Sequence, residues 1–88
     1  MSDETILAGI RRILGEMDVD PAVDGAAPTR DLHLVRDLDL DSLKRIELVI
    51  RIENEFRVRL EPEDEAEIVT LGDLVDVIRR RHGGAERA

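Results

Sequence analysis

Apolar residues recur at the spacing of one helix face near the start of the chain. Within residues 6–17 they stand at positions i, i+4, i+7, i+8 and i+11, as Ile6, Ile10, Ile13, Leu14 and Met17. Because an α-helix brings these positions to one side, the pattern predicts an amphipathic helix. Ser2 or Asp3 can cap its N-terminus, since the side-chain oxygens of both residue types accept hydrogen bonds from free backbone N–H groups.

A second helical pattern begins at Leu43 and is rich in apolar positions. One face is formed by Leu43, Ile46, Val49, Ile50 and Phe56, and the face is widened by Leu48 and Ile52. This stripe is broader than a single core-facing side requires. We therefore expect core contacts on two sides, with contact to a ligand or partner as the alternative. Asp41 fits as the N-cap of this helix and Ser42 as its first residue.

Two further helices are predicted after residue 60. The segment PEDEAEI favours a short helix, because Pro62 suits a first helical position and acidic residues favour the first turn. The following TLGD matches a capping box formed by Thr70 and Asp73. A last apolar stripe follows at Leu71, Leu74, Val75 and Ile78. We assign residues 1–82 to one folded domain and residues 83–88 to a flexible C-terminal tail.

The connection between the first two predicted helices, roughly residues 18–41, is long for so small a domain. Its prolines, glycine and aspartates favour a loop, and long loops in compact domains usually serve a function. Apolar residues in its second half need partly buried positions, namely Leu32, Leu34, Val35, Leu38 and Leu40. The expected fold is all-α: a four-helix bundle of three main helices and one short helix, up-and-down in outline, with a long first loop.

Length and composition argue against several classes of function. A chain of 88 residues has room for one small core but not for an enclosed active site with lids. The absence of cysteine excludes disulfides and thiol catalysis, and a net charge of −8 with a single aromatic residue argues against nucleic-acid binding. No apolar run approaches the roughly 20 residues that span a bilayer, and the acidic start lacks the basic region of a secretory signal. We expect a cytoplasmic monomer that does not insert into membranes.

The aspartates before Ser42 have one feature of a metal site. Asp37, Asp39 and Asp41 show the spacing of the first calcium ligands in an EF-hand loop. That loop also requires glycine at its sixth position and glutamate at its twelfth, where this chain has Ser42 and Leu48. The missing turn residue and the missing bidentate ligand argue against a specific calcium site.

Ser42 is next considered as a catalytic nucleophile. A nucleophilic serine needs a neighbouring base and an oxyanion hole. The only imidazoles are His33, in the loop, and His82, beyond the last apolar stripe, and no glycine flanks Ser42 to form a nucleophile elbow. We therefore predict that the chain is not an enzyme. A role in starting the helix explains Ser42 locally, but it leaves the wide apolar stripe and the long loop unexplained.

The stretch VRDLDLDSLKRIELVIRIENEFRV, followed by a short acidic segment and TLGDLVDVI, resembles the acyl carrier protein family, in its discrete type II form. The resemblance covers roughly residues 6–80. It implies that Ser42 is the attachment point of 4′-phosphopantetheine, transferred from coenzyme A by a separate phosphopantetheinyl transferase. The thiol of this arm would carry an acyl group as a thioester, which agrees with a chain that has no cysteine of its own. Asp41 would assist the transferase by its position.

The resemblance also implies partners and alternatives. Leu43, Ile46 and Ile50 would flank the arm and meet the acyl-transferring, condensing and modifying enzymes of fatty acid, polyketide or specialised lipid biosynthesis. The arm would alternate between an exposed state and partial burial of a short acyl chain between the helices. A peptidyl or aminoacyl carrier uses the same arm, although the approach and helix look more like the fatty-acid and polyketide side. An unmodified helical adaptor is the alternative from another class.

The chain departs from the family pattern in two places. Asp39 stands where many relatives carry glycine, which would tighten or stiffen the turn before Ser42. Residues 42–56 are neutral overall, because Lys44, Arg45 and Arg51 offset Glu47, Glu53 and Glu55. Charge complementarity mainly sets encounter rate and partner choice. With Lys44, Arg45, Glu47 and Glu53 among the partner-binding residues, we expect discrimination against housekeeping fatty acid synthase enzymes and service in a dedicated pathway; tolerated variation of a solvated face is the alternative.

Overall fold

The chain forms four α-helices in the computed structural model, which describes residues 2–19 and 30–86, with side chains as far as His82. The helices are α1 (Asp3–Glu16), α2 (Ser42–Phe56), α3 (Pro62–Glu67) and α4 (Leu71–Glu86). Within the described residues, β-structure is limited to an isolated bridge between His33 and Thr70. The predicted all-α fold of three main helices and one short helix is confirmed.

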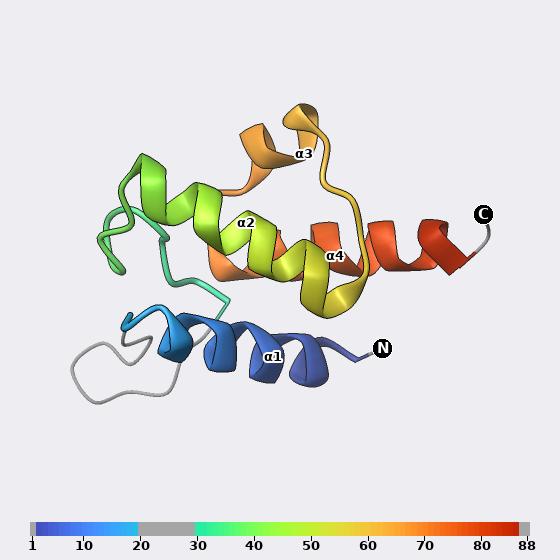
Figure 1. The fold of residues 1–88 in the computed structure, drawn as a ribbon, viewed down its shortest axis with the longest axis horizontal. Helices are drawn as coiled ribbons and strands as arrows, with labels where there is room; N and C mark the ends of the chain where they lie inside the picture. The colour runs from blue at the N-terminus through green and yellow to red at the C-terminus, as the bar shows by residue number, and fades with distance from the viewer. Residues whose placement is uncertain (1, 20–29, 87–88) are drawn as a thin grey trace.

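α3 lies on the side of α2 away from α1 (Figure 1). α1 packs against both α2 and α4. α1 runs opposite to α2, as an up-and-down bundle requires, but α4 runs in the same direction as α2 (Figure 1). This direction follows from the segment between α2 and α4, which carries the chain back along the bundle together with α3. The start of α2 therefore lies at the end of the molecule away from both termini.

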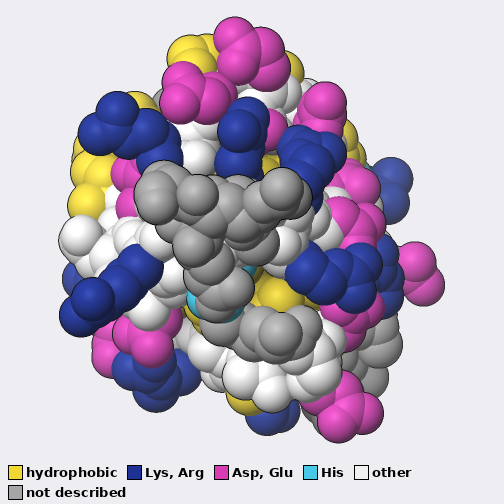
Figure 2. All heavy atoms as spheres, turned by 90° about the vertical axis from the view of Figure 1, so that its right-hand side faces the viewer, with side chains coloured by type: hydrophobic (Ala, Val, Ile, Leu, Met, Phe, Trp, Pro, Cys, Tyr) yellow, Lys and Arg dark blue, Asp and Glu magenta, His cyan; other side chains and the backbone are white. Residues whose placement is uncertain are grey.

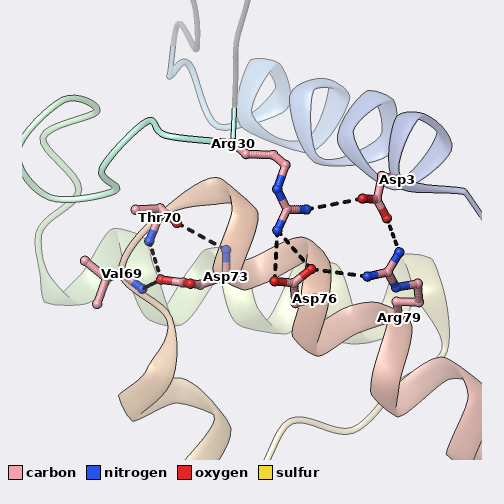
Figure 3. A network of polar contacts seen from close by, with 7 residues as sticks. All are labelled: Asp3, Arg30, Val69, Thr70, Asp73, Asp76 and Arg79. Carbon is pink, nitrogen blue, oxygen red and sulfur yellow. Dashed lines mark hydrogen bonds and ion pairs between the residues drawn. The ribbon is translucent and has the colours of Figure 1, made fainter.

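Each predicted helix start has the expected cap. The Ser2 hydroxyl accepts a hydrogen bond from the Thr5 N–H over 3.2 Å. At α4, the Thr70 N–H donates to the Asp73 carboxylate and the Asp73 N–H donates to the Thr70 hydroxyl, over 3.1 and 3.2 Å. Burial would raise the pKa of Asp73, but the hydrogen bonds from Thr70 and Val69 outweigh it and leave that pKa lowered (Figure 3). α4 continues to Glu86, past the predicted domain end at residue 82; flexibility of residues 83–88 stays a prediction.

The hydrophobic core contains side chains from all three long helices and from the segments that connect them. Its most completely buried large side chains are Ile6, Ile10, Ile13, Leu14, Leu40, Ile52, Leu71, Leu74, Val75 and Ile78. From the wide apolar stripe of α2, however, Leu43, Ile46 and Ile50 are 74%, 55% and 52% exposed. The expectation of core contact on two sides is wrong for these three residues. α2 has α1 on one side, and the six-residue α3 is too short to cover the other.

The segment before α2 is fixed to the start of α4 by backbone hydrogen bonds. The Leu34 N–H donates to Val69 and the Leu71 N–H donates to Leu32, each over 2.9 Å. Leu34, Leu38 and Leu40 are buried and Leu32 is partly buried, as expected, but Val35 is 47% exposed because it lies in an outward turn. Residues 20–29, which carry most of the predicted loop signals, lie outside the described residues.

Arg30 joins this segment to two helices (Figure 3). Its guanidinium donates to both carboxylate oxygens of Asp76, over 3.0 and 2.9 Å, and to Asp3 over 3.3 Å. The hydrogen bond with Asp76 raises the pKa of Arg30. Gly72 gives the arginine room against α4, since a Cβ there would lie 3.0 Å from the Arg30 Cβ. Exposed ion pairs of this kind each add little to the free energy of unfolding. The main effect of the network is therefore to position Arg30 between α1 and α4.

α3 is held to α4 through a buried carboxylate. Asp64 is 2% exposed and accepts hydrogen bonds from Arg81 Nε over 2.7 Å and Arg80 Nη2 over 2.8 Å. The hydrogen bond from Arg81, helped by the Glu61 N–H and by Arg80, overcomes desolvation and lowers the Asp64 pKa to about 2. The predicted role of Pro62 at the start of this helix is confirmed.

The end of the molecule opposite Ser42 carries mixed charge. Figure 2 shows Lys and Arg side chains interspersed with Asp and Glu over this face. None of the helices in the described part of the chain is long and apolar enough to cross a bilayer.

Candidate functional site

Ser42 is the first residue of α2 and is exposed to solvent. Asp41 caps the helix as predicted: its Oδ1 accepts from the Lys44 N–H over 2.8 Å, and its carbonyl accepts from the Arg45 N–H over 2.9 Å. No described residue forms a hydrogen bond with the Ser42 hydroxyl. The helix start therefore fixes the backbone of Ser42 and leaves its oxygen available for modification.

The position also suits a negatively charged substituent. The first N–H groups of a helix have no intrahelical acceptor, and Asp41 accepts from those of Lys44 and Arg45 but not from those of Ser42 and Leu43. The amides of Ser42 and Leu43 and the positive end of the helix dipole therefore favour an anion near the Ser42 oxygen.

A tight turn brings the chain to this helix. His33 Nδ1 accepts hydrogen bonds from the N–H groups of Val35 and Arg36, over 3.2 and 3.0 Å. The Asp37 carboxylate accepts from the His33 N–H over 2.8 Å. Because its Nδ1 is engaged within the turn, His33 has a structural role and does not serve Ser42 as a base.

Asp39 adopts a left-handed backbone conformation in the approach to Ser42, with a φ of 56°. For residues with a Cβ this region is less favourable by roughly 1–2 kcal/mol, although aspartate tolerates it better than most. Glycine, which the family resemblance places here, has no such penalty. Within residues 30–41, the described part of the approach to α2, Asp39 is the one residue with a positive φ. It is also the position at which this chain departs from the glycine of the family pattern.

The aspartates of the approach do not converge on a metal site. In the described ranges, no group of three or more His, Cys, Asp or Glu residues is arranged to hold a metal ion. Asp37 and Asp41 instead accept backbone hydrogen bonds from His33 and Lys44.

A cavity of about 200 Å³ opens beside Ser42, between α2 and α3. We call it the Ser42 cavity; it is lined by Leu34, Ser42, Arg45, Ile46, Leu48, Val49, Glu65, Ile68 and Leu74. Most of these side chains are apolar, so the cavity favours an apolar ligand attached at or near Ser42.

Some cavity residues were not predicted as site residues from the sequence. Leu34 comes from the approach loop, Glu65 from α3, Ile68 from the C-cap of α3, and Leu74 from α4. The sequence shows them as apolar or acidic residues in separate elements, and only the packing of α3 beside α2 brings them together. The sequence offered one sign of this cavity, namely the apolar residue Ile68 directly after the acidic segment that forms α3.

Three of the predicted partner-binding residues form polar contacts with other residues of the chain. Lys44 Nζ donates to the Met17 carbonyl oxygen over 3.3 Å. Glu47 pairs with Arg51 Nε over 3.1 Å. The Glu53 carboxylate accepts from the Leu60 N–H over 2.9 Å, just after α2. The contacts of Lys44 and Glu53 join α2 to neighbouring segments, whereas the Glu47–Arg51 pair lies on the surface of α2 itself. The partner-binding role of the three residues stays a prediction.

The structure thus presents an exposed serine at a helix start, beside an apolar cavity and with its local imidazole engaged elsewhere, on a small helical domain. The family model described as "Phosphopantetheine attachment site" matches residues 4–78. The chain belongs to the acyl carrier protein family. It is a phosphopantetheine-dependent carrier of acyl groups and not itself a catalyst.

Individual relatives agree with this assignment. A meromycolate extension acyl carrier protein of Mycobacterium leprae is 32% identical over 80 residues, which span 91% of this chain and 67% of the relative. An acyl carrier protein of Lactobacillus acidophilus is 34% identical over 84 residues, covering 94% of this chain and 100% of the relative. The crystal structure of an acyl carrier protein from Thermotoga maritima superposes with a TM-score of 0.83 at 26% identity, covering 97% and 95% of the two chains.

Proposed function

We propose that Ser42 carries the 4′-phosphopantetheine arm and that the chain thereby tethers acyl intermediates as thioesters. The observation that carries this proposal is the exposed Ser42 hydroxyl at the capped start of α2, which is hydrogen-bonded to none of the residues that the structure describes. The only other serine, Ser2, caps α1 and is hydrogen-bonded to Thr5. A phosphopantetheinyl transferase would join the Ser42 oxygen to the β-phosphorus of coenzyme A, with release of adenosine bisphosphate and the hydroxyl proton.

The neighbours of Ser42 support access by that transferase. The Asp41 carboxylate keeps the helix start ordered through the Lys44 N–H, so the serine is presented in a single backbone geometry. Leu43 is 74% exposed and offers an apolar contact directly beside the reacting oxygen. Asp41 thus assists transfer by position.

The Ser42 cavity supports transient burial of the cargo. Its volume of about 200 Å³ and its mostly apolar lining suit a short acyl chain attached at Ser42.

The partner surface supports a dedicated biosynthetic pathway. Ile46 and Ile50 form an exposed apolar strip with Leu43, while α2 has no excess of negative charge for a basic docking site. Among the relatives is a meromycolate extension carrier, whose name points to lipid extension. We expect poor turnover of the acyl-loaded protein by a generic fatty-acid-synthase reductase or acyltransferase; efficient turnover would show that α2 charge does not set partner choice. A monomeric state and a cytoplasmic location stay predictions.

Intact-mass spectrometry tests the attachment. The purified chain is incubated with coenzyme A and a broad-specificity phosphopantetheinyl transferase. We expect a mass gain of one phosphopantetheine in the wild type and no gain in Ser42→Ala. An unchanged wild-type mass would overturn the proposal and favour an unmodified adaptor.

A further inference from the structure

Arg45 differs from the other basic residues of α2. Lys44 is bound to the Met17 carbonyl, and Arg51 pairs with Glu47 and Glu16 over 3.1 and 3.3 Å. The side chain of Arg45, by contrast, forms no hydrogen bond or ion pair with any residue in the described ranges 2–19 and 30–86. Its side chain is also half-buried.

Arg45 faces the space into which a Ser42 substituent would extend. It lines the Ser42 cavity together with Ser42 itself, and also a neighbouring cavity of about 260 Å³. Residues three positions apart on a helix have Cβ atoms about 5–6 Å from each other, a distance that an arginine side chain spans easily. Glu65 is the one acidic residue lining both cavities, and its carboxylate forms no ion pair with Arg45.

We propose that Arg45 binds the phosphate of the arm carried on Ser42, a role that rests on the proposed attachment at Ser42. The phosphodiester keeps a negative charge at neutral pH, and the planar guanidinium can donate two parallel hydrogen bonds to its oxygens. The free amides of Ser42 and Leu43 approach the same phosphate from the helix start. The Arg45 guanidinium and these two amides together form an anion site, and the phosphate fills it once the arm is attached to Ser42.

This contact directs the arm. Arg45 stands at the Ser42 cavity, so a phosphate bound to it starts the arm on the side of α2 that faces α3. The opposite direction leads over the exposed Leu43 to the partner surface. Arg45 is therefore a positioning residue that favours the buried state of the cargo, and competing anions or salt shift the arm toward the exposed state.

The direct test is nuclear magnetic resonance of the Arg45 side chain before and after modification. Intact mass first establishes that the arm is attached. We expect the Arg45 Nε–Hε signal to shift on modification and its proton exchange to slow by about threefold to tenfold, as one charge-assisted hydrogen bond at a half-exposed site implies. In modified Arg45→Gln, the ³¹P signal of the arm should sharpen and move toward that of the same phosphodiester in the denatured modified protein.

Arg51→Gln is the matched control, because it makes the same charge change on the same helix, nine residues beyond Ser42. It should leave the ³¹P signal unchanged. A modified wild type whose Arg45 signal does not move would overturn the inference while leaving the attachment intact. The Arg45 Nε–Hε signal could instead shift in the unmodified Glu65→Gln variant and stay unchanged when the wild type is modified. That result would show that Arg45 pairs with Glu65 and not with the phosphate, and it would overturn the inference. Absence of the mass gain would contradict the attachment itself.

Discussion

The ammonium group of Lys44 donates a hydrogen bond to the carbonyl oxygen of Met17, 3.3 Å away, and so joins the start of α2 to the end of α1. The last carbonyl groups of a helix lack intrahelical partners and favour positive charge. Lys44 thus satisfies one of these groups from only two residues beyond Ser42. This contact links the geometry around Ser42, the proposed attachment site, to the packing of α1.

Lys44→Met should therefore lower the free energy of unfolding by about 1 kcal/mol, because the Met17 carbonyl loses a charged donor. Lys44→Arg, which keeps a cation of similar reach, should recover most of that loss. Urea denaturation followed by circular dichroism measures both variants. If Lys44→Met matched the wild type in stability and changed only partner turnover, the lysine would face partners instead of α1.

Substitutions at Asp39 should follow its left-handed backbone. Asp39→Val should lower stability by about 1–2 kcal/mol, since a β-branched residue is strained at positive φ. Asp39→Gly should stay within about 0.5 kcal/mol of the wild type, because relief in the folded chain is offset by greater freedom in the unfolded chain. Equal stability of the valine and glycine variants would show that residue 39 does not hold this conformation in solution.

Ile50 and Ile52 form a matched pair on α2. Ile52 is fully buried, so Ile52→Ala should cost about 2–5 kcal/mol of stability. Ile50 is 52% exposed, so Ile50→Ala should change stability by less than about 0.5 kcal/mol while slowing turnover by the cognate partner enzymes. Thermal denaturation and an acyl-transfer assay separate the two effects. A large loss of stability in Ile50→Ala would place this residue in the core.

Acid should weaken the tie between α3 and α4. The pKa of Asp64 is lowered from 3.8 to about 2, so its stabilising contribution is complete above pH 4 and is lost as the pH falls toward 2. The free-energy difference between wild type and Asp64→Asn should be about 1–2 kcal/mol at pH 6, discounted for the partly exposed arginines. Denaturation at several pH values should show this difference shrinking between pH 4 and 2. A difference independent of pH would contradict the charged contact.

Local patterns predicted the helices and their starts because the interactions involved are short-range. Apolar periodicity located the stripes of the long helices, and cap chemistry located Asp41 and Thr70 at their starts. The backbone conformation of Asp39 was anticipated only as a departure from glycine at that position, because a single side chain does not reveal the φ it adopts.

Long-range packing accounts for what could not be predicted. The α2 stripe is wide enough for several orientations, and the exposure of Ile46 depends on the short length of α3. The pairing of Asp64 with Arg81 joins residues 17 positions apart on different helices. The Ser42 cavity likewise exists only after α3 has packed beside α2.

The most direct test of the account is to locate the arm on the chain. After loading from coenzyme A, the modified protein is digested and the phosphopantetheine-bearing peptide is sequenced by fragmentation mass spectrometry, with Ser2→Ala as the control that should load normally. The account predicts the added mass on Ser42 alone. Added mass on Ser2 or a threonine, or loading that persists in Ser42→Ala, would contradict it.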